Sequence, residues 1–241
     1  MPTAAGPGTA GPPAASTGGL IAVLPAHDEA PRIGSVIGGA TRHVRVLVVD
    51  DGSTDETATV ARSAGAEVLE QRPNQGKGAA LRAGFRRALE VGAIAVITLD
   101  ADGQHDPADL PRFLDAALAD AELVVGQRDF GAMPLLRRTS NAAGTVLLSA
   151  ALGRWIPDNQ SGYRRIGRRL MSAMLESRDD GFAFEVEMIA VCLREGWPIS
   201  WVPIRTIYGE ERSHIKPLRH LREFLAVTAR ARRISRGGPL G

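Results

Sequence analysis

Three aspartates in the middle of the chain have the clearest potential for chemistry. Asp100, Asp102 and Asp106 follow the apolar run 93–99 in the segment VITLDADGQHDP. The run has the length and the β-branched residues of a buried strand, so its carboxyl end would carry these acids, where open α/β sheets bind ligands. Two carboxylates separated by one small residue can share Mg²⁺ or Mn²⁺, with phosphate oxygens of a substrate completing the shell. The competing interpretation is a turn that caps a helix beginning at Pro107.

Polar and acidic groups also follow the first two predicted strands. The strand at 20–24 is followed by His27 and Glu29, and the strand at 44–49 is followed by Asp51. Because parallel strands present their carboxyl ends at one edge of a sheet, these groups should converge with the acids of the fourth strand. Convergence from three strand ends indicates a site more strongly than any one motif does.

Basic side chains that could face phosphates come mainly from other segments. They are Lys77 in the loop RPNQGKG, Arg128, Arg137, Arg138, Arg212 and Lys216. Acids and bases of this kind suit a nucleoside diphosphate held through its metal, its ribose and its charged oxygens. The lysine loop lacks the upstream glycine and the following Ser or Thr of a P-loop, and no GxGxxG follows the first strand. Neither a GxSxG elbow nor an HExxH helix is present.

The positioning elements alternate between strand and helix patterns. Strands are predicted at 20–24, 44–49, 66–70, 93–99 and 122–125, and helices at 31–41, 54–64, 79–91 and 107–118. This alternation predicts an α/β fold with a mainly parallel sheet, and the nearly continuous apolar strands indicate helices on both faces. The second half is less regular. Its predicted helices span 135–152, 182–195 and 218–234, with a short strand after the loop 157–163, an edge strand at 199–204 and a polar loop at 208–217.

The composition is ordinary for a globular protein, with 44% hydrophobic and 23% charged residues, so the chain has ample apolar material for a core. The net charge of +2 gives no reason to expect a nucleic-acid partner. Cys192 is the only cysteine, which excludes an internal disulfide and a Cys-rich zinc site, and we expect it to be a buried thiol. No apolar run reaches the roughly 18 residues of a transmembrane helix, and no signal peptide is evident, so we expect a cytoplasmic protein.

The order of the motifs gives a resemblance to a known family. The chain contains LPAHDEA, VVDDGSTDET, NQGKG, LDADGQHDP, VVGQR, DNQSGYR, FAFEVEM and GEERSHIKP in succession. In this it resembles the family 2 glycosyltransferases and, within them, the dolichyl- or polyprenyl-phosphate mannose or glucose synthase group. The resemblance covers residues 20–225. It implies a GT-A fold, a nucleotide-sugar donor of the GDP-mannose or UDP-glucose type, Mg²⁺ or Mn²⁺, and a polyprenyl-phosphate acceptor.

The resemblance also implies roles for single residues. The donor would be bound by Pro25, His27, Glu29, Asp51, Lys77, Asp100, Ala101 and Asp102, with Asp102 and Gln104 as metal ligands. Asp102, Arg128, Arg212 and Lys216 would take part in the reaction, the last two with Ser213 in a loop over the donor diphosphate and the acceptor phosphate. Since a phosphate acceptor is already ionised, we predict positioned arginines on the acceptor side and no catalytic carboxylate.

Some residues of these motifs depart from the family pattern or are expected to have structural roles only. His27-Asp28 stands where the family commonly has Tyr-Asn, and Glu185 stands where a Gln is common. We expect Glu185 to pack or to form a hydrogen bond, one of Arg164 and Arg165 to order the preceding loop, and His105 to belong to its loop, not to the metal shell.

By composition the chain divides into three parts. Residues 1–19 are almost all Ala, Gly, Pro, Ser and Thr and are predicted to be a disordered tail. Residues 20–217 form the catalytic domain, with a nucleotide-sugar half at 20–126 and an acceptor half at 127–217. The segment 218–241 is a basic helix and tail, which either lies on anionic lipid at the inner face of the cell membrane or is a solvated helix.

Three other functions remain open. The first keeps the fold but transfers the sugar to a soluble acceptor, such as a small phosphorylated acid. The second is a sugar-phosphate nucleotidyltransferase, which the absence of a Gly-rich Arg-Lys loop after the first strand disfavours. The third is a non-catalytic protein that binds a nucleotide sugar, which the intact aspartate pair disfavours.

Overall fold

The computed structural model of the protein describes residues 19–129, 131, 135–181, 183–205, 207 and 217–240. The predicted tail lies outside the described residues except for Gly19. Arg212, Ser213 and Lys216 also lie outside them, so their predicted roles stay predictions.

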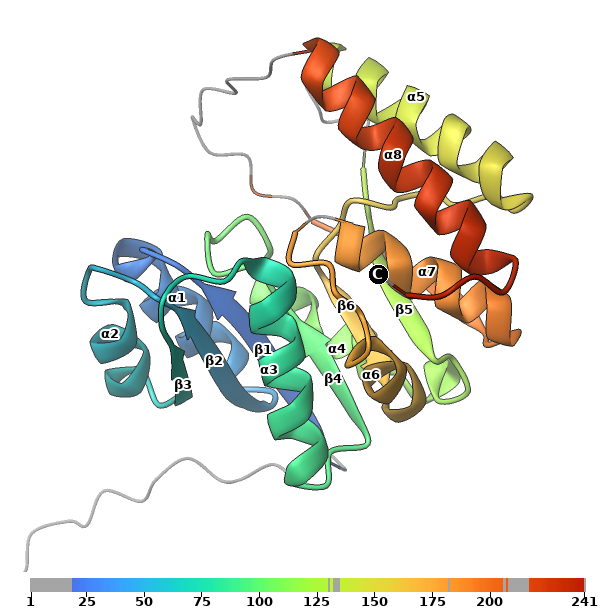
Figure 1. The fold of residues 1–241 in the computed structure, drawn as a ribbon. Helices are drawn as coiled ribbons and strands as arrows, with labels where there is room; N and C mark the ends of the chain where they lie inside the picture. The colour runs from blue at the N-terminus through green and yellow to red at the C-terminus, as the bar shows by residue number, and fades with distance from the viewer. Residues whose placement is uncertain are drawn as a thin grey trace, which may run out of the picture.

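A seven-stranded sheet in the order β3-β2-β1-β4-β6-β5-β7 forms the centre of the described chain (Figure 1). Its strands are β1 (Leu20–Ala26), β2 (Arg45–Asp51), β3 (Glu67–Gln71), β4 (Ala95–Thr98), β5 (Leu123–Arg128), β6 (Arg164–Gly167) and β7 (Ile199–Ile204). Strand β6 runs antiparallel to both of its neighbours, and the other adjacent pairs are parallel. The prediction of a mainly parallel α/β sheet is confirmed.

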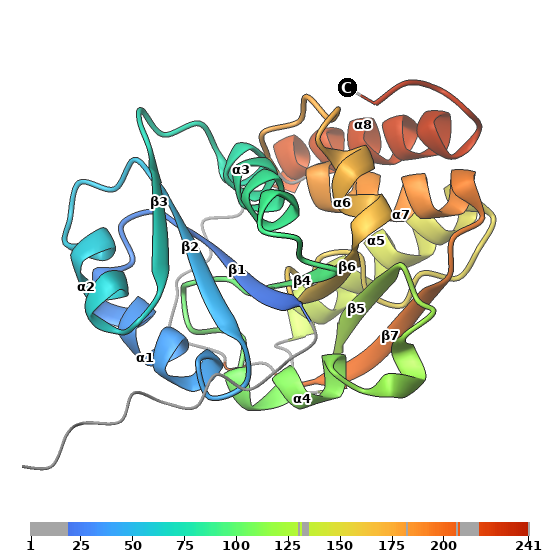
Figure 2. The same ribbon diagram turned by 90° about the horizontal axis from the view of Figure 1, so that it is seen from below.

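Helices cover both faces of the sheet, with α1 and α4 on one side and α3, α6 and α7 on the other (Figure 2). The helices are α1 (Ala30–Ala40), α2 (Thr57–Ser63), α3 (Lys77–Glu90), α4 (Leu110–Phe113), α5 (Leu135–Leu152), α6 (Arg168–Met174), α7 (Ala183–Glu195) and α8 (Pro217–Ser235). Alternate residues of β1 enter opposite cores: Val23 belongs to the core that includes α3 and α7, whereas Leu24 belongs to the core that includes α1. This two-residue period explains why the central strands are apolar throughout.

The predicted helix at 107–118 is wrong as a continuous element. The chain instead forms the 3₁₀ turn η1 (Pro107–Asp109), the single turn α4, and the 3₁₀ turn η2 (Ala116–Leu118). Pro111 has no N–H to continue a helical ladder, and the Asp115 carboxylate accepts a hydrogen bond from Ala117 N (2.9 Å), which starts a new turn. Asp106 caps η1 through Ala108 N (2.9 Å), as the capping prediction for this aspartate required.

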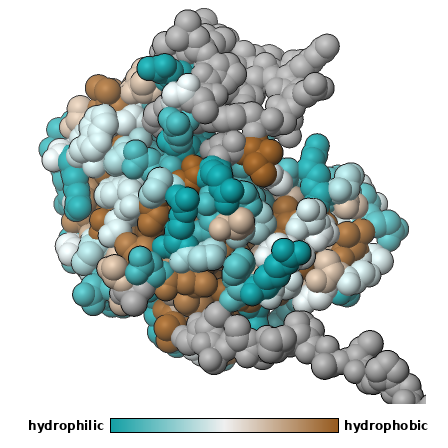
Figure 3. Space-filling model, turned by 180° about the vertical axis from the view of Figure 1, so that it is seen from behind, coloured by the Kyte–Doolittle hydropathy of each residue, from teal (hydrophilic) through white to brown (hydrophobic). Residues whose placement is uncertain are grey.

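Helices α5 and α8 lie side by side at the edge of the molecule, and α7 lies between α8 and the sheet (Figure 1). Cys192 on α7 is fully buried, which confirms the expected buried thiol. On the face turned away in Figure 1, hydrophilic residues are mixed with smaller hydrophobic areas over the described part (Figure 3). None of the helices in the described ranges combines the length and the hydropathy needed to span a membrane.

Candidate active site

A cavity of about 340 Å³ opens at the carboxyl edge of the sheet. Its walls come from the segments after β1, β2 and β4 and from the beginning of α3. It is lined by Pro25, Ala26, His27, Glu29, Asp51, Asn74, Gly76, Lys77, Ala80, Asp100, Ala101 and Asp102. The structure therefore brings all the predicted donor residues to one place. Ala26, Asn74, Gly76 and Ala80 also line the cavity and were missed, because the prediction was built on charged side chains and motif positions and not on the backbone between them.

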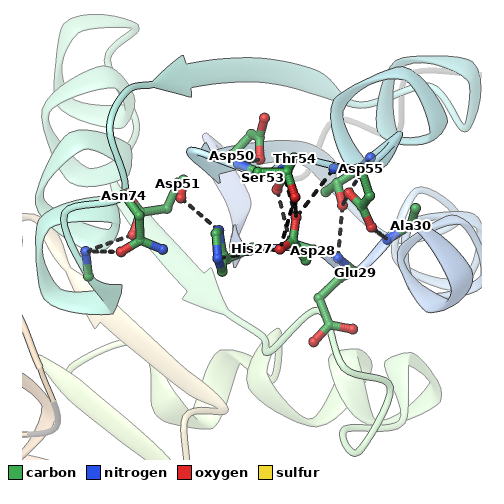
Figure 4. Close-up of polar contacts among 12 residues, drawn as sticks. His27, Asp28, Glu29, Ala30, Asp50, Asp51, Ser53, Thr54, Asp55 and Asn74 are labelled. Atoms are coloured by element: carbon green, nitrogen blue, oxygen red, sulfur yellow. Dashed lines mark hydrogen bonds and ion pairs between the residues drawn. The ribbon is translucent and has the colours of Figure 1, made fainter.

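The loops after β1 and β2 hold each other by reciprocal capping (Figure 4). Asp28 has a left-handed backbone (φ 54°), and its carboxylate accepts hydrogen bonds from Thr54 N (2.7 Å) and Asp55 N (3.3 Å). Hydrogen bonding from Thr54 lowers the pKa of Asp28 below its ordinary value. In return, Asp55 accepts from Ala30 N (3.1 Å) at the start of α1. This exchange fixes the residues on either side of Asp28, which line the cavity.

Asp51 organises the rim of the cavity. His27 Nδ1 donates to the Asp51 carbonyl (3.0 Å), and the Asp51 carboxylate accepts from Gln71 Nε2 (2.6 Å), Gln75 N (2.8 Å) and Gly76 N (2.7 Å). With 4% of its surface exposed, Asp51 folds the segment after β3 across the end of the sheet. The residue predicted to meet the donor's base or ribose thus also holds the loop that supplies Asn74 and Gly76 to the cavity wall.

Lys77 joins the two halves of the protein. Its Nζ lies 2.6 Å from Asp100 Oδ1 and 3.1 Å from Glu185 Oε1 at the start of α7. Burial by itself would lower the pKa of Lys77, but Glu185 and Asp100 raise it above its ordinary value, so the ammonium stays charged. The predicted hydrogen-bonding role of Glu185 is confirmed, although sequence reasoning did not place it beside the cavity.

His105 supports the loop that carries the aspartate pair. It is buried, and its Nδ1 accepts from Asp100 N (3.3 Å). Burial lowers the pKa of His105, which keeps the imidazole neutral and its Nδ1 an acceptor, in spite of the Asp100 carboxylate 3.7 Å away. This contact confirms the loop role expected for His105.

Asp102 faces the cavity at the position predicted for a metal ligand. Its Oδ1 accepts from Gln104 N (2.9 Å), so the backbone of Gln104 orients the carboxylate. Within the described ranges, no group of three His, Cys, Asp or Glu side chains is arranged to hold a metal ion by itself. One or two carboxylates on an open cavity nevertheless fit Mg²⁺ or Mn²⁺, because these ions take their remaining ligands from water and substrate phosphates.

Arg128 lies at the end of β5 in a bidentate ion pair. Its Nε and Nη2 lie 2.7 and 2.9 Å from the two carboxylate oxygens of Asp158, which is fully buried. Asp158 thereby fixes the plane of a guanidinium predicted to meet phosphate. Of the other predicted basic residues, Arg138 is exposed on α5, and the Arg137 side chain lies outside what the structure describes.

The loop before β6 is ordered by Arg164, which is fully buried. Its guanidinium donates to the carbonyls of Asn159 (3.0 Å), Ser161 (2.7 Å) and Glu185, which confirms that one of the two arginines orders this loop. A side chain at Gly162 would come within 2.7 Å of the Asp100 carboxylate. Gly162, at the end of this loop, therefore lies directly against Asp100.

The same fold is found in the glucosyl-3-phosphoglycerate synthase of Mycobacterium tuberculosis, crystallised with Mn²⁺, UDP and glucosyl-3-phosphoglycerate. The two share 23% identity with a TM-score of 0.68, over 96% of this chain and 88% of that one. Fold and cavity together define the class of protein: an α/β protein with a cavity at the carboxyl edge of a mainly parallel sheet. The model of the glycosyl transferase family 2 matches residues 21–192, and the chain belongs to that family. The predicted fold and family are confirmed.

Two relatives illustrate the branch of the family. The undecaprenyl-phosphate mannosyltransferase of Micrococcus luteus is 34% identical over 208 residues, which cover 79% of this chain and 84% of that protein. The polyprenol monophosphomannose synthase of Mycolicibacterium smegmatis is 30% identical over 200 residues, which cover 76% of each protein. The chain is therefore an enzyme that is similar to transferases named for polyprenyl-phosphate acceptors.

Proposed function

We propose that the enzyme transfers a hexose from a nucleotide sugar of the GDP-mannose or UDP-glucose type to a polyprenyl phosphate, with inversion at the sugar and with Mg²⁺ or Mn²⁺. One observation carries the proposal: a single cavity holds Asp102, Asp100 and Lys77 together at the carboxyl edge of the sheet. The names of the M. luteus and M. smegmatis relatives support the lipid acceptor.

The donor side must offset the negative charge that develops on the leaving diphosphate. Asp102 and the Gln104 position would hold the metal, which when bound supplies positive charge to the diphosphate oxygens. Lys77 adds a fixed ammonium, and the Asp100 and Glu185 carboxylates keep it charged and oriented. Positive groups already in place where charge develops usually give the largest catalytic contribution at such sites.

The acceptor side needs orientation more than proton removal. A phosphate monoester is largely ionised near neutral pH and can attack the anomeric carbon without a general base. Arg128, held in plane by Asp158, would orient it together with Arg212 and Lys216.

A second candidate is transfer to a soluble phosphorylated acid. The structure of the M. tuberculosis synthase, which contains glucosyl-3-phosphoglycerate, favours this alternative. Incubation with labelled UDP-glucose or GDP-mannose, Mn²⁺, and either undecaprenyl phosphate or 3-phosphoglycerate separates the two. Label in the organic extract supports the lipid acceptor, whereas label only in the aqueous product with 3-phosphoglycerate supports the second candidate.

A matched pair of variants tests the metal assignment. Asp102→Asn should abolish turnover, because it removes charge from the principal metal ligand. Asp106→Asn should leave turnover near wild type, since Asp106 caps η1 and does not line the cavity. Full activity of Asp102→Asn would show that the metal is held elsewhere.

We also propose peripheral contact of α5 and α8 with an anionic membrane. Arg232, Arg233 and Arg236 are exposed near the end of the chain, and Leu225 on α8 and Val146 on α5 are 45% and 58% exposed. Basic and apolar side chains together favour an anionic lipid surface, with about 1 kcal/mol from each basic group.

Co-sedimentation with vesicles tests the membrane contact. The protein should bind phosphatidylglycerol vesicles better than phosphatidylcholine vesicles, and Arg232→Gln/Arg233→Gln should reduce the difference. Equal binding to both lipids would refute the electrostatic contact. Arg230 is left out because it faces α7 in two ion pairs and is not part of the exposed face.

A further inference from the structure

The two glycines that flank Lys77 pack against backbone from a distant part of the chain. A Cβ at Gly76 would lie 2.4 Å from the Asp180 carbonyl oxygen, and a Cβ at Gly78 would lie 2.3 Å from the Asp179 carbonyl oxygen. Gly78 N also donates to the Asp180 carbonyl (2.9 Å). Because the glycines of the GKG sequence have no side chains, the backbone of the segment 177–181 can approach them closely. This contact fixes the position of the backbone on either side of Lys77.

The segment 177–181 is held in turn by helix α8. Arg230 Nη1 lies 2.9 Å from Asp179 Oδ2. Arg230 Nε lies 2.5 Å from Glu187 Oε1, as an ion pair not aligned for a hydrogen bond. Ser177 Oγ donates to the other Glu187 oxygen (2.5 Å), and Glu187 is 1% exposed. Arg230 is thus the cation that pairs with both the partly buried Asp179 and the buried Glu187 carboxylate.

Asp179 connects this ion pair to the lysine by a second route. While its Oδ2 pairs with Arg230, its Oδ1 accepts from Gly181 N (2.9 Å) and Phe184 N (3.1 Å) at the beginning of α7. The first turn of α7 carries Glu185, whose carboxylate pairs with Lys77. One aspartate therefore fixes both the backbone beside Lys77 and the helix turn that holds the Lys77 ammonium.

We infer that Arg230 is a positioning residue for Lys77. The contact of α8 with α7 through Arg230 would then determine the affinity of the enzyme for the diphosphate of its donor. Without Arg230, the Asp179 and Glu187 carboxylates would repel each other with no cation between them. Asp179 is the one able to move, because Glu187 lies within a helix and is buried. Its movement would shift the cap of α7 and the backbone against Gly76 and Gly78. The inference rests on the proposed function only in taking a nucleoside diphosphate as the ligand.

Calorimetric titration with UDP and with GDP, each with Mn²⁺ and without lipid, tests the inference on the full chain. Arg230→Gln should weaken nucleotide binding about tenfold, within the range found for residues that act on a site through others. Arg230→Lys, which keeps the charge, should restore part of the affinity. Arg222→Gln removes the same charge from an exposed position of α8 and should leave the affinity unchanged.

A double-mutant cycle distinguishes positioning from general loss of structure. If Arg230 acts through Lys77, Arg230→Gln should weaken binding no further in a Lys77→Met background. The same loss in both backgrounds, or unchanged affinity of Arg230→Gln in the wild-type background, would overturn the inference. If circular dichroism shows that Arg230→Gln is unfolded, the cycle is run with Arg230→Lys under the same criteria. A wild-type enzyme that binds neither nucleotide would instead refute the proposed function, and the inference with it.

Discussion

Replacement of Gly78 by alanine isolates the contact between the backbone beside Lys77 and the segment 177–181. Gly78 lies in the first turn of α3, where alanine is intrinsically the better residue by about 1 kcal/mol. An added methyl group would stand 2.3 Å from the Asp179 carbonyl oxygen. The chain must therefore move, whatever the helix propensity favours.

The size of the effect follows from the geometry. To bring that contact to 3.0 Å, α3 and the segment 177–181 must separate by about 0.7 Å. Overpacking of this kind costs about 1–3 kcal/mol, and the hydrogen bond from Gly78 N to the Asp180 carbonyl contributes about 1 kcal/mol more if it breaks. After the gain in helix propensity, we expect a net loss of about 1–3 kcal/mol in the free energy of unfolding.

Urea denaturation of a matched pair of variants measures this loss. Gly38 lies within α1 with open space around the position of its missing Cβ, so Gly38→Ala should stabilise the protein by about 0.5–1 kcal/mol. Gly78→Ala should destabilise it and should also weaken binding of UDP or GDP with Mn²⁺. Equal stabilisation by both substitutions would refute the close approach at Gly78 and the reasoning built on it.

Three further predictions concern Cys192, Asp158 and Asp100. Burial raises the pKa of Cys192 to about 12, so the thiol should resist Ellman's reagent at pH 8 until the protein unfolds, and labelling at the rate of a free thiol would contradict this. Asp158→Asn leaves the Arg128 guanidinium without its carboxylate and should cost about 2–4 kcal/mol in urea denaturation, whereas a loss under 1 kcal/mol would show that the pair is dispensable. Burial would raise the pKa of Asp100, but Lys77 lowers it below the ordinary value of 3.8. A lowered carboxyl pKa stabilises the fold above pH 3.8, and this stabilisation is lost as the pH falls through the folded value. Between pH 6 and pH 3 the wild type should therefore lose more stability than Asp100→Asn does, and equal losses would argue against the ion pair.

The cavity could be anticipated because it depends on sheet geometry. Acids after β1, β2 and β4 meet at one edge whenever these strands are parallel neighbours, and the apolar runs predicted that arrangement. Local capping could be predicted for a different reason: the contact of Asp106 with Ala108 N spans only two residues and so depends on local sequence alone.

Contacts between distant segments could not be read in this way. The pairing of Arg128 with Asp158 and the packing of Gly78 against Asp179 depend on how the second half folds back on the first. The GKG sequence does not match a P-loop, and its glycines instead admit the backbone of Asp179 and Asp180. The predicted helix at 107–118 failed for a local reason, because Pro111 and the turn at Asp115 interrupt it and the prediction took account of neither.

The place of β6 in the sheet has a consequence for how the chain must fold. This strand comes from the second half but lies between β4 and β5, and it pairs Thr98 with Arg164, 66 residues later. When β5 is synthesised, neither of the strands that flank it, β6 and β7, has yet been made. Both edges of the apolar strand β5 therefore stay unpaired until β6 and β7 are available. This predicts slow folding and a nascent chain that must be protected from aggregation. A fragment ending at residue 126 should accordingly fail to fold by itself.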